Sequence, residues 1–321
     1  MGIHPVAYSL DEVKALAPRA AAVTLGVFDG VHRGHRSIIE ELLKAGDQPD
    51  IESKYLITFN PHPVVVTQSR EAPKILSTIE ERLDLLQEYR LDGVFVVGFD
   101  EKIRNTDYRD FIRRYLLEAF DMRSLVLGYD CHFGRNREGG PESVQAEGRR
   151  LGFDVKIVPP LMVDGQVASS TYIRSTLIDG DLLLANRLLG HPYSVSGVVE
   201  RGAGKGGSIG YPTANLRIDH PRKLWPSGGA YAVRVKVGAE VHNGMMNVGT
   251  APTLKGGKPT IEVHIFDFER DIYGETVVSY CLARMRDEVA FPSPSALVEQ
   301  LGRDRRAALE ILTREGDGEG R

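Results

Sequence analysis

Two histidines, His32 and His35, lie three residues apart in the stretch GVFDGVHRGH, where a glycine-rich corner separates an apolar run from a helical pattern. The run VTLGVFDG predicts the end of a strand, and HRSIIEELL predicts the start of a helix. A helix N-terminus offers unpaired backbone N–H groups and a partial positive charge, and glycines let a ligand approach the backbone closely. Two imidazoles there can donate hydrogen bonds to phosphate oxygens as negative charge develops on them. The pattern therefore predicts a site that handles phosphate.

Two other interpretations of the histidine pair stay open at this point. Histidines at positions i and i+3 can bind zinc, although no further cluster of Cys or His lies at ligand spacing in the sequence. The pair can also be a solvated part of a loop without a chemical role. Neither a G-x-G-x-x-G run nor a G-x-x-x-x-G-K-[ST] loop is present at this corner, so the glycines alone identify no nucleotide-binding motif.

A second stretch, VASSTYIRSTLIDGDLLLANRLLG, supports the phosphate interpretation. Ser169 or Ser170 is expected to be an N-cap, which places Arg174 in about the first turn of the helix that follows. A cation there opposes the helix dipole, and a polyphosphate bound between the arginine and the helix end would relieve that repulsion. The alternative is an arginine that points into solvent.

The elements that must position these residues follow two different patterns along the chain. Up to about residue 190, helical patterns alternate with short apolar runs, which are AVTLGVF, KYLITF, GVFVVGF, SLVLGYD and DVKIVPP. Such alternation predicts a parallel sheet covered by helices on both faces, with ligands beyond the carboxyl ends of the strands. After LLLANRLLGHPY, Gly-rich turns and strands predict a mostly antiparallel sheet or small barrel. A closing helix is expected over about residues 294–312, followed by a disordered tail.

Composition limits the function classes. The chain has 321 residues, of which 42% are hydrophobic and 26% charged, so it can bury a sizeable core and is expected to form two domains. A net charge of -4 offers no basic field for nucleic acid, and no apolar run approaches the roughly 18 residues of a membrane span. There is no secretory signal pattern, and Cys131 and Cys281 are too few for a disulfide framework. We therefore expect a cytoplasmic protein that binds neither nucleic acid nor membranes, with both cysteines as small packing residues.

Two sets of residues in the second half also suggest chemistry. If PTAN enters a strand, Thr213 and Asn215 point to one face and present oxygen donors that suit Mg²⁺ shared with ATP phosphates; otherwise they satisfy a turn. In PTIEVHIFDF, Glu262 lies on the face opposite the aliphatic stripe, where a glutamate can also be simply exposed to solvent. The nearby run GAGKGGSIG is not a Walker loop, because Lys205 is followed by glycine.

Eight motifs, in order, resemble those of the bacterial bifunctional riboflavin kinase/FMN adenylyltransferases, also called FAD synthetases. The first motif, LGVFDGVHRGH, contains the H-x-G-H signature of the nucleotidyltransferase superfamily. It is followed by TFNPHP, GYDCHFGRNREG and SSTYIR. The other four resemble the flavokinase module, and they are GKGGSIGYPTANL, NVGTAPT, IEVHIFDFERDIYG and RMRDEVAFPSPSALVEQL. The resemblance covers nearly the whole chain. It implies a Rossmann-like nucleotidyltransferase domain in residues 1–185, a small flavokinase β-barrel with a terminal helix in residues 186–315, and a disordered tail in residues 316–321.

The resemblance also implies two reactions on small molecules. Riboflavin is phosphorylated to FMN with ATP and Mg²⁺, and FMN is adenylylated with a second ATP to give FAD and pyrophosphate. The phosphate of FMN is already a nucleophile, so the second reaction rests on positioning and charge stabilisation. The terminal hydroxyl of riboflavin must lose a proton, and the family's proposed base aligns with Glu262.

Further residue roles follow from the same resemblance. The implied catalytic residues are His32 and His35 on the ATP phosphates, Arg174 on the leaving pyrophosphate, and Glu262 as the base. The residues implied to bind ATP are Gly26, Phe28, Asp29, Gly34, Ser170, Thr171, Gly204, Lys205 and Gly210. Those implied to bind flavin are Asn60, His62, Asp130, Arg135 and Arg286, the last with a solvated arginine as its alternative. The sequence departs from the family pattern where Cys131-His132 follow Asp130, since many members have Phe at the first of these positions.

Three other functions stay open. The first is an enzyme that retains only one of the two activities, of which the kinase is the safer prediction because its metal and base positions are all present. The second is a catalytically silent flavin- or nucleotide-binding protein. The presence of all four implied catalytic residues argues against it; they are His32, His35, Arg174 and Glu262. An H-x-G-H aminoacyl-tRNA synthetase would carry a Lys-Met-Ser-Lys-Ser-type loop and a basic RNA-binding region, and the sequence contains neither.

Overall fold

The computed structural model describes residues 4–66, 72–202, 205–250 and 259–318, without the side chains of residues 205, 208, 250, 259 and 315–318. The chain divides into two compact units, Met1–Ser169 and Ser170–Arg321. The division falls before the domain boundary predicted at residues 185/186, because α9 (Ser170–Ile178) packs on α10 (Leu182–Leu189), and α10 packs on two strands of the second unit. The boundary between independently folding domains stays a prediction.

The first unit is built on six parallel strands in the order β1-β4-β3-β2-β5-β6. Every residue of β2 is buried, and so are the first five residues of β4, as expected for a sheet that is covered on both faces. The predicted parallel sheet is therefore confirmed. The strands are β1 (Val6–Ala7), β2 (Ala21–Leu25), β3 (Ser53–Asn60), β4 (Gly93–Gly98), β5 (Met122–Gly128) and β6 (Asp154–Val158).

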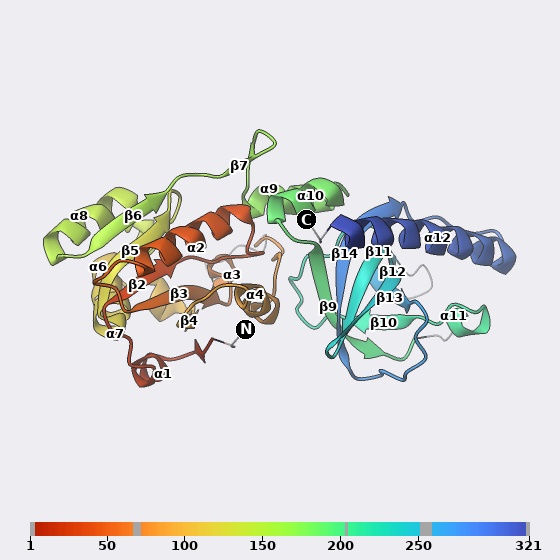
Figure 1. The fold of residues 1–321 in the computed structure, drawn as a ribbon, viewed down its shortest axis with the longest axis horizontal. Helices are drawn as coiled ribbons and strands as arrows, with labels where there is room; N and C mark the ends of the chain where they lie inside the picture. The colour runs from red at the N-terminus through yellow and green to blue at the C-terminus, as the bar shows by residue number, and fades with distance from the viewer. Residues whose placement is uncertain (1–3, 67–71, 203–204, 251–258, 319–321) are drawn as a thin grey trace. The chain divides into compact units, whose positions relative to one another are not determined.

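Helices pack on both faces of this sheet (Figure 1). On one face, Ile39 of α2 packs in a cluster with Leu56 of β3. On the other, Phe111 packs in a cluster with Tyr55 and Ile57, the residues that flank Leu56 in the alternating pattern of a strand. The helices are α1 (Leu10–Ala15), α2 (Arg33–Gly46), α3 (Pro63–Val66), α4 (Ile79–Leu86), α5 (Glu101–Arg104), α6 (Tyr108–Phe111), the π-helix η1 (Ile112–Leu117), α7 (Glu118–Phe120), the 3₁₀ turn η2 (Arg135–Arg137) and α8 (Pro141–Leu151).

The strand order reverses between β2 and β5. From β2 the chain goes to β3 and β4 on one side, and it later returns to β5 and β6 on the other. Loops diverge at such a switch point and leave a crevice at the carboxyl ends of the strands. The loop after β2 carries the histidine pair and the loop after β5 carries Asp130, so both lie at the edge where ligands bind in open α/β sheets.

Several short elements of the first unit have no clear signal in the sequence. The strand β1 and the hairpin of β7 (Met162–Val163) and β8 (Gln166–Val167) have two residues per strand, which is too short for any periodicity. These elements are consequences of tertiary packing rather than of local pattern.

The second unit contains a closed antiparallel barrel in the order β10-β13-β12-β11-β14-β9, after the helices α9 and α10. This confirms the predicted small barrel. Ile261 and Val263 are fully buried whereas Glu262 between them is half-buried, so the carboxylate lies opposite the aliphatic stripe. The elements are β9 (Tyr193–Glu200), α11 (Lys205–Ser208), β10 (Ala214–Arg217), β11 (Gly229–Val237), β12 (Glu240–Thr250), β13 (Pro259–Ile265) and β14 (Thr276–Arg286).

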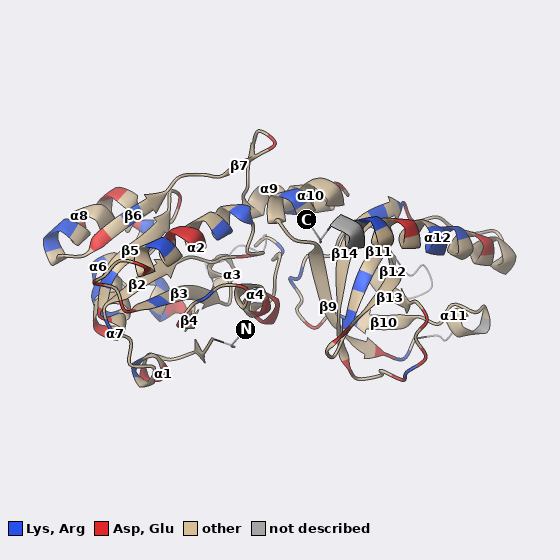
Figure 2. Ribbon diagram, in the orientation of Figure 1, with Lys and Arg blue, Asp and Glu red and all other residues tan. Residues whose placement is uncertain are grey.

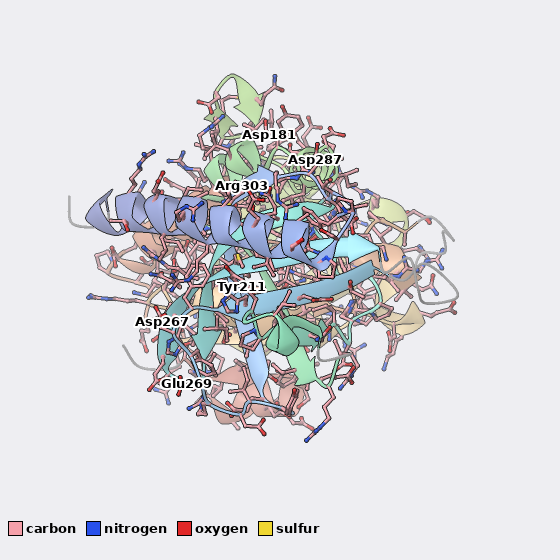
Figure 3. All side chains as sticks on the ribbon, turned by 90° about the vertical axis from the view of Figure 1, so that its right-hand side faces the viewer. Asp181, Tyr211, Asp267, Glu269, Asp287 and Arg303 are labelled. Carbon is pink, nitrogen blue, oxygen red and sulfur yellow. The ribbon has the colours of Figure 1, made fainter. Side chains whose placement is uncertain are left out.

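The helix α12 (Pro294–Gly318) packs against β11, β12 and β14. Its residues Leu301, Ala308 and Leu312 belong to the cluster that covers this side of the barrel, and Figure 3 shows the helix lying across the strands. The predicted closing helix is present. It continues beyond residue 312, since Arg and Glu at positions 314 and 315 are good helix formers. The helix bounds thus reach into the predicted tail, residues 319–321 lie outside the described part, and the predicted disorder of residues 316–321 stays a prediction.

Charged residues of both signs lie along the outer helices (Figure 2), and both cysteines are free. Figure 2 shows Lys and Arg interspersed with Asp and Glu along α8 and α12, whereas β2 and β4 carry no charged residue. Both cysteines are free, and burial raises the pKa of Cys281 to about 12. Within the described residues, no helix combines the length and the apolar character that crossing a membrane requires.

Candidate functional site

The corner after β2 has an unusual backbone. Phe28 and Val31 have φ angles of 52° and 40°, in the left-handed region that costs non-glycine residues energy, and Gly30 between them has a φ of 81°. The side chains of Phe28 and Val31 are buried, so packing holds this conformation in place. The corner is therefore a fixed loop, and its shape brings the end of β2 directly to the start of α2.

His32 is the N-cap of α2. Its Nδ1 accepts a hydrogen bond from the backbone N–H of His35 at 3.3 Å. An accepting nitrogen carries no hydrogen, so the neutral ring bears its hydrogen on Nε2. The His35 ring stacks on the His32 ring, with 3.6 Å between centroids and 22° between planes. The structure thus brings the two predicted catalytic imidazoles together as a stacked pair at a helix N-terminus.

Gly34, which separates the two histidines, is required by space. A Cβ at this position would lie 2.7 Å from the carbonyl oxygen of Ala168 and 3.1 Å from the ring of His32. Any larger residue would displace either the His32 ring or the 168 backbone. The glycine of H-x-G-H therefore preserves the geometry of the pair.

Asp29 has a structural role that the sequence did not reveal. Its side chain is 1% exposed, and its carboxylate accepts hydrogen bonds at 2.9 Å from the backbone N–H groups of Leu76 and Ser77. The Ser77 hydroxyl oxygen accepts in turn from the N–H of Gly30 at 2.8 Å. Asp29 thus ties the segment before α4 to the histidine corner, and its predicted contact with ATP stays a prediction.

Replacing Asp29 by alanine is expected to destabilise the first unit by about 2–5 kcal/mol, because the buried N–H groups of Leu76 and Ser77 lose their acceptor. Hydrogen exchange of the β2 and β3 amides measures this unit separately. Asp130→Ala, at an exposed aspartate of the same unit, is the matched control and should leave exchange nearly unchanged. Equal protection in both variants would contradict the role assigned to Asp29.

Arg82 of α4 is hydrogen-bonded to the end of β3, which in turn is hydrogen-bonded to the histidine corner. Its Nη1 donates to Thr58 Oγ1 at 2.9 Å and to the Phe59 carbonyl at 3.1 Å, and Thr58 Oγ1 donates to the Val27 carbonyl at 2.8 Å. Burial lowers the pKa of Arg82, and the nearby carboxylate of Asp29 opposes that shift. Sequence reasoning missed this network because Arg82 stands in IEERLDLL as one of several charged helix residues.

The predicted flavin residues of the first unit lie on neighbouring loops. Asn60 is the exposed last residue of β3, and the Nδ1 of His62 accepts from the N–H of Val64 at 3.2 Å. Asp130 follows β5, and Arg135 begins η2; both are exposed. Since β3, β2 and β5 are adjacent, Asn60 and Asp130 flank the histidine corner at the same edge of the sheet.

The two residues of the unusual dipeptide Cys131-His132 lie in different surroundings. The Cys131 thiol donates to the Leu25 carbonyl at 3.5 Å, and burial raises its pKa to about 12, so this side chain packs the loop against β2. His132 is exposed, and its Nδ1 lies 2.9 Å from the Asp130 carbonyl oxygen. The departure from the family pattern, Cys131 in place of Phe, therefore lies in the packing of the loop, whereas His132 gives the loop an exposed polar side chain.

Ser170, Thr171 and Arg174 belong to the second unit. Ser170 is the first residue of α9, so Ser169 precedes the helix, and Arg174 follows one turn later. Ser170 and Arg174 are half-buried and Thr171 is exposed. Their role at the phosphate site stays a prediction.

A row of polar residues crosses three strands of the barrel. Glu262 of β13 is directly paired with Asn215 of β10 on one side and with Asn247 of β12 on the other. Directly paired residues of an antiparallel sheet project from the same face. Glu262 therefore shares one face of the sheet with an asparagine on each neighbouring strand, and the row continues through Ala230 of β11 to Arg286 of β14.

Glu262 and Arg286 line one cavity of about 310 Å³. Thr213, just before β10, also lines it, and its hydroxyl lies 3.4 Å from Glu262 Oε2. Asn215 is not among the lining residues, and its side chain lies against the backbone of Gly202. The structure therefore brings Glu262, Thr213 and Arg286 to one cavity, with Asn215 beside them.

His264, which no motif assigned, holds this end of the cavity together. Its Nδ1 donates to the Pro212 carbonyl at 2.7 Å, and its ring meets that of Tyr211 edge-on at 5.3 Å between centroids. Because Pro212 precedes Thr213, this bond fixes the position of the threonine hydroxyl relative to Glu262. The cross-strand register that unites these residues cannot be read from sequence.

The glycine-rich run before β10 is only partly described. Gly204 lies outside the described residues, and Lys205 is the first residue of α11. Gly210 has a φ of 82°, a left-handed conformation that ends the short helix. Gly206 from the same run lines the cavity, which places this part of the run beside it.

Two family models match the chain, and together they cover most of it. The FAD synthetase model matches residues 14–172, and the riboflavin kinase model matches residues 189–312. Each match falls within one of the two parts of the chain that the motifs indicate.

Curated relatives match most of the chain. The chain is 36% identical to the bifunctional riboflavin kinase/FMN adenylyltransferase of Haemophilus influenzae over 89% of this chain and 92% of the relative. It is also 36% identical to that of Escherichia coli K12, over 92% and 94%. A crystal structure from Streptococcus pneumoniae, described as a macrolide-efflux protein, is similar with a TM-score of 0.84 and 31% identity, over 96% of this chain and 99% of that one. The chain therefore belongs to the family of bifunctional riboflavin kinase/FMN adenylyltransferases.

Proposed function

We propose that the chain makes FMN and then FAD at two separate sites. The barrel unit transfers the terminal phosphoryl group of ATP to riboflavin, and the parallel-sheet unit transfers the adenylyl group of a second ATP to FMN. Family membership supports both activities, since each of the two family models matches one part of the chain. Riboflavin, FMN and ATP are the substrates.

The phosphoryl transfer is assigned to the cavity that contains Glu262. The terminal ribityl oxygen of riboflavin attacks the γ-phosphorus of ATP, the bond to the ADP oxygen breaks, and the Glu262 carboxylate accepts the hydroxyl proton. The observation that carries this assignment is the position of Glu262 in a cavity, 3.4 Å from the Thr213 hydroxyl and between two asparagines. A carboxylate that merely faced solvent would need no such setting.

The donors around Glu262 also fit Mg²⁺, which prefers oxygen ligands. Thr213 offers its hydroxyl, Asn215 its amide oxygen, and the Glu262 carboxylate lies beside both. We assign the metal to Thr213 and Asn215. When bound with ATP, it neutralises charge on the phosphates.

The adenylyl transfer is assigned to the histidine corner. A phosphate oxygen of FMN attacks the α-phosphorus of ATP, and the bond to pyrophosphate breaks, so neither a base nor a covalent intermediate is required. The Nε2–H of His32 and the stacked ring of His35 are placed to stabilise charge on the phosphates, helped by the N-terminus of α2. Arg174, with Ser170 and Thr171, is proposed to hold the leaving pyrophosphate.

We also propose that the protein works in the cytoplasm. Both cysteines are free, which is typical of proteins from reducing compartments.

A chromatographic time course tests the proposed function. Purified protein is incubated with riboflavin, ATP and Mg²⁺, and riboflavin, FMN and FAD are quantified separately. FMN that rises and then gives way to FAD is the expected result. FMN without FAD would remove the activity assigned to the histidine corner, and no turnover at all would leave a silent flavin-binding protein.

A further inference from the structure

Asp304 is a buried carboxylate on the terminal helix α12, and it lines the same cavity as Glu262. It is 4% exposed, and it pairs with Arg286 at the end of β14. The Nε of Arg286 donates to Oδ1 and Oδ2 at 3.0 and 3.1 Å, and Nη2 donates to Oδ2 at 2.7 Å. This is a two-pronged contact in which the guanidinium and carboxylate planes set each other's direction.

Other contacts complete this arrangement. Gln300, one turn earlier on α12, donates from Nε2 to Asp304 Oδ1 at 2.7 Å, so the carboxylate is itself oriented. Nη1 of Arg286 donates to the Asp287 carbonyl at 2.9 Å, and the guanidinium carbon lies 5.8 Å from the centroid of the Phe291 ring. The arginine is therefore held from several directions at the wall of the cavity.

Two of the five N–H groups of Arg286 can donate to a ligand. A guanidinium has five N–H groups in a fixed plane. Asp304 accepts the single N–H of Nε and one N–H of Nη2, and the Asp287 carbonyl accepts one N–H of Nη1. One N–H on each terminal nitrogen is left without a partner among the described residues. Because the plane is fixed, both of these point in a set direction.

Resting on the proposed function, we propose that Asp304 is a positioning residue for riboflavin binding. It orients Arg286 so that the two remaining N–H groups donate to an acceptor atom of the flavin, and α12 thereby completes the kinase site. Phe291 and the apolar residues Leu297 and Leu301 line the same cavity and suit the flat ring system. The alternative is an ion pair that only fastens α12 to the barrel.

A double-mutant cycle separates these possibilities. Asp304→Asn, Arg286→Gln and the double variant are compared with the unaltered full chain by titrating riboflavin fluorescence and by the KM values for riboflavin and ATP. Each single variant should weaken riboflavin binding about tenfold or more, while the KM for ATP changes little. The double variant should be no weaker than Arg286→Gln alone, because Asp304 acts only through Arg286.

Two further variants keep the test decisive if Asp304→Asn folds poorly. Gln300→Ala retains the ion pair but loosens the carboxylate, and it should weaken riboflavin binding by a smaller factor. Glu299→Gln removes an exposed ion pair with Arg303 on the same helix and should change nothing (Figure 3 labels Arg303). Urea unfolding of every variant reports stability separately.

The outcomes are distinct. Lower stability of Asp304→Asn with unchanged riboflavin affinity would overturn the proposal, since the pair would then be structural only. Effects that multiply in the double variant would also overturn it, because Asp304 would contact the ligand itself. Failure of the unaltered chain to phosphorylate riboflavin that it binds would instead overturn the proposed function, and the affinity cycle would still decide the role of Asp304. An unaltered chain that does not bind riboflavin overturns both.

Discussion

A variant in which His32 is replaced by asparagine and His35 by glutamine should form FAD from FMN about 10³-fold more slowly, because removing even one such hydrogen-bond donor to a charged transition state costs about 10²–10³ in rate. Riboflavin phosphorylation by the same chain should be nearly unchanged. The measurement is the initial rate of each reaction with saturating substrates.

The choice of asparagine separates chemistry from folding. His32 accepts the N-terminal hydrogen bond of α2, and alanine would remove that cap at a cost of about 1 kcal/mol. Asparagine is a good N-cap, so it retains the acceptor while removing the imidazole. If His32→Asn keeps full FAD synthesis while His32→Ala loses it, the ring is only a cap and the catalytic assignment is wrong.

Replacing Glu262 by glutamine should lower the rate of riboflavin phosphorylation by about 10²–10⁴, the usual contribution of a positioned general base. The amide has nearly the same shape, so the row with Asn215 and Asn247 is retained while proton acceptance is lost. FAD formation from supplied FMN should be unaffected. The measurement is kcat for FMN formation beside kcat for FAD formation.

The matched control is Glu240→Gln, at an exposed glutamate of β12 that lies against His242. It changes one carboxylate to an amide on the same barrel and should leave both rates unchanged. A parallel loss of both activities in Glu262→Gln would contradict the assignment of separate sites.

The fold was largely predictable because it depends on periodicity. The apolar runs that became β2 to β6, and the alternation of Ile261 and Val263 with Glu262, are local patterns that the packed structure retains. The end of α12 was not predictable, since glycines and charged residues after position 312 resemble a tail in composition but continue the helix to Gly318.

The sites were predictable only where local motifs name the residues. The stacking of His32 on His35 follows from their spacing at a helix start. In contrast, Asn247 joins Glu262 only through strand register, and Asp304 meets Arg286 across 18 positions. The structural role of Asp29 was not predictable either, because its carboxylate accepts hydrogen bonds from backbone amides 47 and 48 positions away, and its predicted contact with ATP stays a prediction. Long-range pairing of this kind leaves no trace in a single sequence.

The closed barrel restricts substitutions in one part of the lining of the cavity that contains Glu262 more than in the rest. The strand that carries Glu262 is hydrogen-bonded to a neighbour on each side, and a shift by one residue would turn the carboxylate into the apolar interior. Val289, Phe291 and residues of α12 also line this cavity, and none of them takes part in a strand ladder. Directed evolution toward altered flavin analogues should therefore collect its substitutions between residues 287 and 301, and leave residues 259–265 untouched.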